Sequence, residues 1–180
     1  GIRLSGRTLP QTILPITTIG YAAPGAVLGI GILVPLGIAD NWVADRVLDL
    51  TGYDPGLIFT GTAFAIILAY CVRFFSIAQH TVDGAFGRIS PSLPNAAQSL
   101  GRNKLQVLLQ IYRPLISTST ATALLLIFVD CVKELPATML LRPFNFETLA
   151  TRVHVQASLE DLPNAAPGSI LIVLISLCAV

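Results

Sequence analysis

Four long stretches of this sequence lack charged side chains, and each is about as long as a membrane-spanning helix. They cover residues 13–39, 56–72, 115–129 and 165–180. A helix needs about 20 residues to cross a hydrocarbon core of about 30 Å, so the second and third stretches would borrow flanking residues. The chain is 53% apolar and 12% charged, whereas soluble domains are about 45–50% apolar and about 25% charged. We therefore expect an all-α membrane protein with about four transmembrane spans.

The first stretch is expected to be irregular. Pro15, Pro24 and Pro35 predict a kinked helix or a non-helical entry. Gly25 and Gly29 are four residues apart, so a neighbouring helix is expected to approach closely on that side.

Several classes of function lack the residues that they need. A net charge of +1 without a clustered basic face argues against nucleic acid as a partner. Lys104 and Lys133 lack the glycines and the hydroxyl of a phosphate-binding loop, so ATP hydrolysis is not expected in this chain. The spacing of the three cysteines and of His80 and His154 fits no metal site. We expect no catalytic residue, no metal site and no cofactor here.

The connecting segments differ in charge. The first is acidic, with Asp40, Asp45, Asp49 and Asp54 against Arg46. The second is basic, with Arg73, Arg88, Arg102, Lys104 and Arg113 against Asp83. The positive-inside rule places the second connection in the cytoplasm and the first outside. The same rule places Arg3 and Arg7 inside, and it leaves residues 133–163 outside.

The basic connection contains the pattern of two short helices. Ser90 before Pro91 predicts an N-cap and a first helical residue. The apolar positions that follow have helical spacing and predict one apolar face: Leu93, Ala96, Ala97 and Leu100. Gly101 can adopt the left-handed conformation that ends a helix, and Asn103 can cap the next one.

The second short helix again has a single apolar face and leads through Pro114 into the third span. That face is formed by Leu105, Leu108, Leu109 and Tyr112. From periodicity alone, this helix pair is equally consistent with an amphipathic unit on the inner leaflet, with Arg102, Lys104 and Arg113 near lipid phosphates. A DNA-binding helix-turn-helix has the same pattern, but it is not expected between two membrane spans.

Residues at fixed spacing connect this segment to a known family. Asn95, Ala96 and Ala97 are followed after three residues by Gly101, and Ile111 and Pro114 follow after nine more. This resembles the coupling loop of ABC-importer permeases, whose pattern is Glu-Ala-Ala, three residues, Gly, nine residues, Ile-x-Leu-Pro. Asn95 stands in place of the glutamate, and Arg113 in place of the leucine. The resemblance implies that residues 88–114, called the coupling segment below, contact cytoplasmic ATP-binding subunits.

Further motifs resemble the ferric-iron branch of these permeases, and the similarity extends from about Thr18 over nearly all of the chain. They are Gly-Tyr-Ala-Ala-Pro-Gly at 20–25, Arg-Ile-Ser-Pro-Ser-Leu at 88–93, Val-Lys-Glu-Leu-Pro-Ala-Thr at 132–138 and Leu-Arg-Pro-Phe-Asn-Phe at 141–146. The chain is similar to the C-terminal half of such proteins, which often consist of two fused permease halves. The resemblance implies a type I importer fold that moves ferric iron into the cytoplasm, with a periplasmic iron-binding protein as donor. It also implies cytoplasmic ATP-binding subunits and a second permease half, fused or separate, as partners.

Three charged residues follow the third span. Asp130, Lys133 and Glu134 are spaced so that all three would meet on one side of a helix. They predict either an interfacial ion pair or the outer rim of a translocation path, because charges near hydrocarbon must pair or face water. Beyond them, residues 145–158 could form a short outer helix at which a donor protein docks.

These features together predict one transmembrane permease domain over residues 1–180 in a bacterial inner membrane, working by alternating access. Gly1, the single Met139 and the apolar run to Val180 suggest a fragment of a longer protein. Two alternatives stay open. One is a permease for thiamine, a polyamine or an oxyanion, and the other is a membrane-embedded enzyme or structural subunit with the same packing.

Overall fold

The computed structural model describes residues 20–179 of the chain. Within this range the chain forms helices, turns and loops and no strand, so the all-α prediction is confirmed. In chain order the elements are α3 (Gly25–Thr51), α4 (Ala63–Gly87), α5 (Ser92–Ser99), α6 (Lys104–Val107), the π-helix η1 (Leu108–Tyr112), α7 (Arg113–Lys133), α8 (Pro136–Leu141), α9 (Leu149–Ser158) and α10 (Leu162–Cys178).

Three helical segments in this range are long and apolar enough to cross a membrane: Gly25–Thr51, Ala63–Gly87 and Lys104–Lys133. The fourth expected span corresponds to α10, which is apolar but has only 17 residues. The helices also begin or end beyond the uncharged stretches, because polar residues continue a helix out of the apolar region. In the first stretch, residues 13–19 lie outside the described part, and Pro24 precedes a new helix, α3, which runs on to Thr51.

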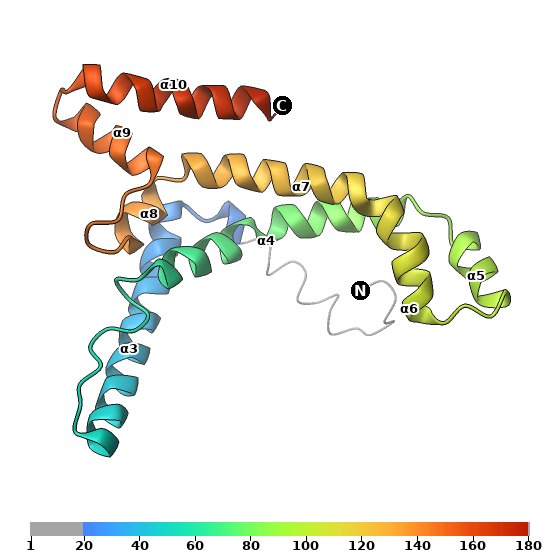
Figure 1. Cartoon of the computed structure of the whole chain (residues 1–180), viewed down its shortest axis with the longest axis horizontal. Helices are drawn as coiled ribbons and strands as arrows, with labels where there is room; N and C mark the ends of the chain where they lie inside the picture. The colour runs from blue at the N-terminus through green and yellow to red at the C-terminus, as the bar shows by residue number, and fades with distance from the viewer. Residues whose placement is uncertain (1–19, 180) are drawn as a thin grey trace.

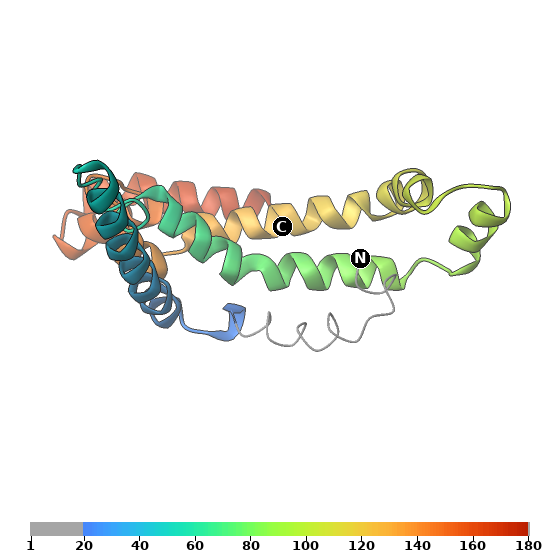
Figure 2. The same cartoon turned by 90° about the horizontal axis from the view of Figure 1, so that it is seen from below.

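The helices α4 and α7 form the long axis of the molecule. They lie side by side and antiparallel, and α10 runs along α7 (Figure 1). Viewed from below, α5 and α6 lie at one end of this pair, and α3, α8 and α9 lie at the other (Figure 2). The coupling segment is therefore separated from α8 by most of the length of α4 and α7.

Helix α3 leaves the α4–α7 axis steeply and packs against α8 (Figure 1). A Cβ added at Gly29 would lie 3.1 Å from Leu140 Cδ1, which confirms the predicted close approach on the side of Gly25 and Gly29. A small core then joins α3, α4 and α8. Its buried members are Leu28, Ala65, Ile66, Ala69 and Leu141.

The predicted acidic connection is mostly helical. Asp40, Asp45 and Asp49 lie inside α3, and only Asp54 lies in the loop that leads to α4. The polar residues after Ala39 contain no helix breaker until Gly52, which ends the helix with a φ of 70°. Asp40 is fully buried and accepts hydrogen bonds from the backbone amides of residues 58, 59 and 60 at 2.9, 2.7 and 2.7 Å. It thereby holds the returning loop against α3.

Candidate functional site

The turn of the coupling segment has the predicted local structure. Gly101 has a φ of 82°, in the left-handed region, and its N–H donates to the carbonyl of Gln98 at 2.9 Å. Asn103 caps α6: its side chain accepts from the Gln106 N–H at 2.8 Å, and the Gln106 side chain accepts from the Asn103 N–H at 3.1 Å. This reciprocal capping box satisfies amide donors at the start of α6.

The start of α5 differs from the prediction. The helix begins at Ser92 and Pro91 is the cap residue, so Ser90 is not the N-cap. The Ser90 hydroxyl lies 2.8 Å from the Ser92 hydroxyl and accepts from the Ser92 N–H at 3.4 Å. The Ser90 carbonyl accepts from the N–H of Leu93, three residues on, at 3.2 Å, whereas the Pro91 carbonyl accepts from the N–H of Asn95, four residues on, at 3.3 Å. The chain therefore forms a tight turn at Ser90, and the α-helical hydrogen bonds begin one residue later.

The expected apolar face of α5 is divided between two environments. Ala97 is only 9% exposed and packs with Val107 and Tyr112, so it lies apart from the other apolar residues of its predicted face. The turn at Gly101 brings α6 under α5, and this covers the side of the helix on which Ala97 lies. The other three apolar residues form an exposed stripe: Leu93, Ala96 and Leu100.

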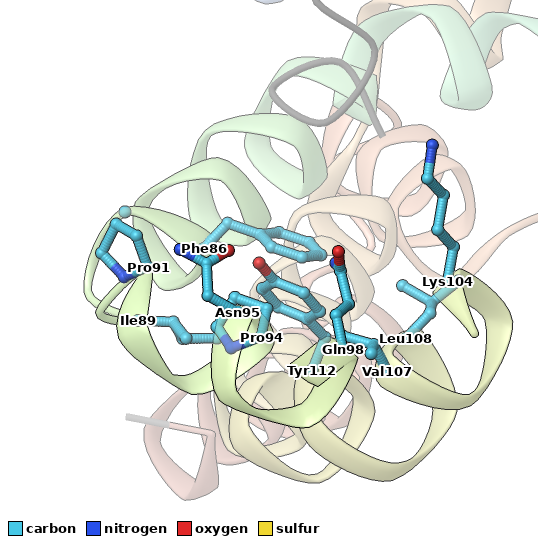
Figure 3. A pocket seen from close by; sticks show the side chains of 11 residues that line it. Phe86, Ile89, Pro91, Pro94, Asn95, Gln98, Lys104, Val107, Leu108 and Tyr112 are labelled. Carbon is cyan, nitrogen blue, oxygen red and sulfur yellow. The ribbon is translucent and has the colours of Figure 1, made fainter. Parts of the chain in front are cut away.

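A cavity of about 460 Å³ opens between the end of α4, α5 and α6. The rings of Phe86 and Tyr112 lie against each other in it, with centroids 5.0 Å apart (Figure 3). Asn95 and Gln98 border the cavity from α5, and Lys104 extends away at its rim (Figure 3). Asn95, the first residue of the coupling pattern, is therefore exposed beside this cavity. It does not belong to the core formed by Ala97, Val107 and Tyr112.

The last two residues of the coupling pattern lie where the segment joins α7. Ile111 is half-buried against the core of Ala97, Val107 and Tyr112. Pro114 is exposed near the start of α7, yet the helical segment Lys104–Lys133 continues past it. The π-helical residues Leu108–Tyr112 come directly before α7. Such turns often mark functional positions in helices.

The charges at the far end of α7 pair differently from the prediction. Lys133 Nζ lies 2.8 Å from Asp130 Oδ1, so this predicted ion pair is confirmed. Glu134 does not share their side of a helix, because α7 ends at Lys133 and Glu134 has extended backbone angles. Its side chain is buried, and its Oε2 lies 3.2 Å from Arg73 Nε on α4.

Arg73 does not belong to the basic connection, so this part of the prediction is wrong. It lies within α4, where its Nη1 also donates to the Ala23 carbonyl at 3.2 Å. The sequence contains a signal for this position, since apolar residues continue on both sides of Arg73, ending at Val72 and resuming at Phe74. A charge inside an apolar stretch is typical of a buried, paired side chain.

Comparison with known proteins gives a consistent result. The sequence profile described as "Binding-protein-dependent transport system inner membrane component" matches residues 1–180. The Fe(3+)-transport system permease protein FbpB 2 of Haemophilus influenzae is 33% identical over 115 residues, 64% of this chain and 23% of that protein. The ferric transport system permease protein FbpB of Actinobacillus pleuropneumoniae is 28% identical over 162 residues, 88% of this chain and 22% of that protein.

A relative named for another solute also matches. The putative 2-aminoethylphosphonate transport system permease protein PhnV of Salmonella typhimurium is 30% identical over 115 residues, which are 64% of this chain and 42% of that protein. The chain thus spans about a quarter of the length of the two ferric permeases and under half of this one.

Proposed function

This chain belongs to the family of binding-protein-dependent transport system inner membrane components, and we propose that it is part of an ATP-driven importer for ferric iron. In this proposal a periplasmic binding protein delivers the iron, cytoplasmic ATP-binding subunits supply the motion, and a second permease half completes the path. The chain contributes conformational gating by alternating access and no covalent chemistry.

The observation that carries the coupling part of this proposal is the exposed apolar stripe of α5 (Leu93, Ala96 and Leu100), held by a rigid turn. Three apolar side chains exposed on a short helix provide a surface for a partner's groove. The segment is also continuous with both long helices, since α4 leads into it and α7 leaves it. Displacement of the coupling segment would therefore act on both long helices at once.

The iron part of the proposal rests on the similarity to two relatives that are named as ferric-iron transport permeases. Both carboxylates near the end of α7 are already engaged, Asp130 by Lys133 and Glu134 by Arg73. Fe(III) would be expected to prefer several oxygen ligands, so iron is expected to pass this part of the path without tight binding. Of the predicted path residues, Asp130 and Lys133 remain the candidates for a transient contact, because their side chains are 20% and 57% exposed.

A second candidate solute is 2-aminoethylphosphonate, because the Salmonella typhimurium relative is named as a putative permease for it. Radio-iron uptake should be measured in cells that carry the complete transporter and in cells that lack this chain. We expect loss of iron uptake on deletion and recovery on complementation. If deletion leaves iron uptake intact and abolishes uptake of the phosphonate, the iron assignment fails and the permease assignment stands.

A further inference from the structure

The ion pair between Arg73 and Glu134 joins the middle of one candidate membrane span, Ala63–Gly87, to the residue that directly follows another, Lys104–Lys133. Arg73 is ten residues from Ala63 and fourteen from Gly87, the two ends of α4. At about 1.5 Å per residue, it lies about 15 Å and about 21 Å along the helix from those ends. The side chains of Arg73 and Glu134 are 18% and 7% exposed. A paired charge at this depth is a functional-site candidate, because a lone charge there is costly.

Four parts of the chain meet at this pair. Arg73 comes from the middle of α4, and Glu134 lies directly between the end of α7 and the start of α8. Arg73 Nη1 also donates to the carbonyl of Ala23, just before α3, at 3.2 Å. Glu134 Oε1 accepts from the N–H of Ala137 in the first turn of α8 at 3.3 Å. Both side chains therefore bridge elements that are far apart in the sequence.

The first turn of α3 touches the pair as well. A Cβ added at Gly25 would lie 2.7 Å from Glu134 Oε1 and 3.1 Å from Arg73 Nη1. The carboxylate thus lies beside the N-terminal ends of two helices, α3 and α8, where the helix dipole favours negative charge. Only glycine fits this contact without displacing one of the charged groups.

At the end of the α4–α7 pair that lies near the coupling segment, other polar and aromatic contacts join the two helices. Arg88 Nη2 donates to Ser119 Oγ at 2.9 Å, and the Phe86 and Tyr112 rings pack at 5.0 Å. The two long helices are consequently held together near the coupling segment and again at Arg73. Movement of one end would be transmitted along them as movement of a rigid body.

We infer that Arg73 and Glu134 form a clamp that fixes α3 and α8 to the α4–α7 pair and so transmits motion of the coupling segment to α8. This role rests on the proposed transport function. It assigns Glu134 to positioning and removes it from the translocation path, because its carboxylate is buried and its charge is already balanced by Arg73.

The first test compares Arg73→Gln, Glu134→Gln and the double variant in the complete transporter. Each single variant leaves one buried charge without its partner, whereas the double variant removes both charges. We expect each single variant to lower the amount of assembled complex and solute uptake at least tenfold, and the double variant to recover at least fivefold over either. If Arg73→Gln is as active as wild type, or if the double variant recovers nothing, the clamp is refuted.

The second test loosens the pair without changing its charge. Gly25→Ala pushes a methyl group into the pair, and Gly31→Ala on the same helix is the control, since a Cβ there has no neighbour within 4 Å. The measured quantity is the number of ATP molecules hydrolysed per solute molecule imported. We expect Gly25→Ala to raise this ratio at least threefold, while Gly31→Ala keeps the wild-type ratio. Equal ratios for the two variants would contradict the clamp.

In both tests, a failure of the clamp proposal gives a different result from a failure of the proposed transport function. The ratio is measured on whichever solute the wild-type complex imports, so an error in the iron assignment does not affect it. If the wild-type complex imports no solute with its donor protein, the transport proposal itself fails. A drop in assembly that is reversed only in the double variant supports the clamp.

Discussion

Replacing Asp40 by alanine should open the loop that leads from α3 to α4. The carboxylate of Asp40 is fully buried and accepts three backbone N–H groups, those of residues 58, 59 and 60. It also accepts the hydroxyl of Thr60. We expect the effect of the substitution to be local, because all four of these hydrogen bonds go to loop residues 58–60.

The size of the effect follows from these amide donors. A buried donor left without a partner costs about 1–3 kcal/mol. Two of the three amides are only partly buried and recover water when the loop moves, so the lower value applies to each of these two, and at least the same value applies to the buried amide of Thr60. The sum is about 3 kcal/mol, and since about 1.4 kcal/mol is a factor of ten, the open population should rise about 100-fold.

Hydrogen–deuterium exchange of the amides at 58–60 in the purified transporter measures this population directly. We expect exchange about 100-fold faster in Asp40→Ala, and a change of less than twofold in Asp45→Ala, whose side chain is exposed on the same helix. Thr60→Val should have an intermediate effect, because it removes only the hydroxyl donor. An increase of less than tenfold in Asp40→Ala would refute the view that this carboxylate holds the loop.

Three further predictions concern the coupling segment and the orientation of the chain. Ala97→Asp should lower the amount of folded permease chain in the membrane, because it buries a charge without a partner. Ala96→Asp on the exposed side should leave that amount unchanged and reduce co-purification of the ATP-binding subunits; equal effects of the two substitutions on both measurements would contradict the division of α5. Gly101→Val forces a β-branched residue to a φ of 82° and should cost about 1–3 kcal/mol, visible as a lower melting temperature of the complex than for Gly101→Asn. In a variant without native cysteines, an impermeant thiol reagent added to spheroplasts should label Asp45→Cys and spare Ser99→Cys, and the opposite result would overturn the predicted orientation.

Local backbone signals in the sequence predicted the turn of the coupling segment correctly. Gly101 and Asn103 act through their own backbone and nearest neighbours, so their conformations follow from residue type. The face of α5 could not be derived in this way. Helical spacing groups Ala97 with Leu93 and Ala96, but which side is covered depends on the direction in which α6 folds back after Gly101. Packing, and not periodicity, determines that direction.

Sequence spacing also could not predict the partner of Glu134. The separation of Asp130 and Lys133 predicted their contact because both lie in one helix. Glu134 is the next residue, yet it lies outside the helix and meets Arg73, which is 61 positions earlier in the sequence. Such a contact depends on the antiparallel packing of α4 and α7. One general principle would have singled out Arg73, namely that a charge within an apolar helix needs a partner.

The placement of Arg73 also changes the basis of the orientation prediction. The positive-inside rule counts basic residues in short connections near the ends of spans, and a guanidinium buried within α4 beside a carboxylate does not belong in that count. Without it, four basic residues remain, Arg88, Arg102, Lys104 and Arg113, and all four lie at the end of the molecule that holds α5 and α6. Of the acidic residues at the other side of α4, Asp40 is likewise buried, but Asp45, Asp49 and Asp54 are exposed. The charge asymmetry that predicts a cytoplasmic coupling segment therefore rests on exposed groups, and it persists after both buried charges are removed.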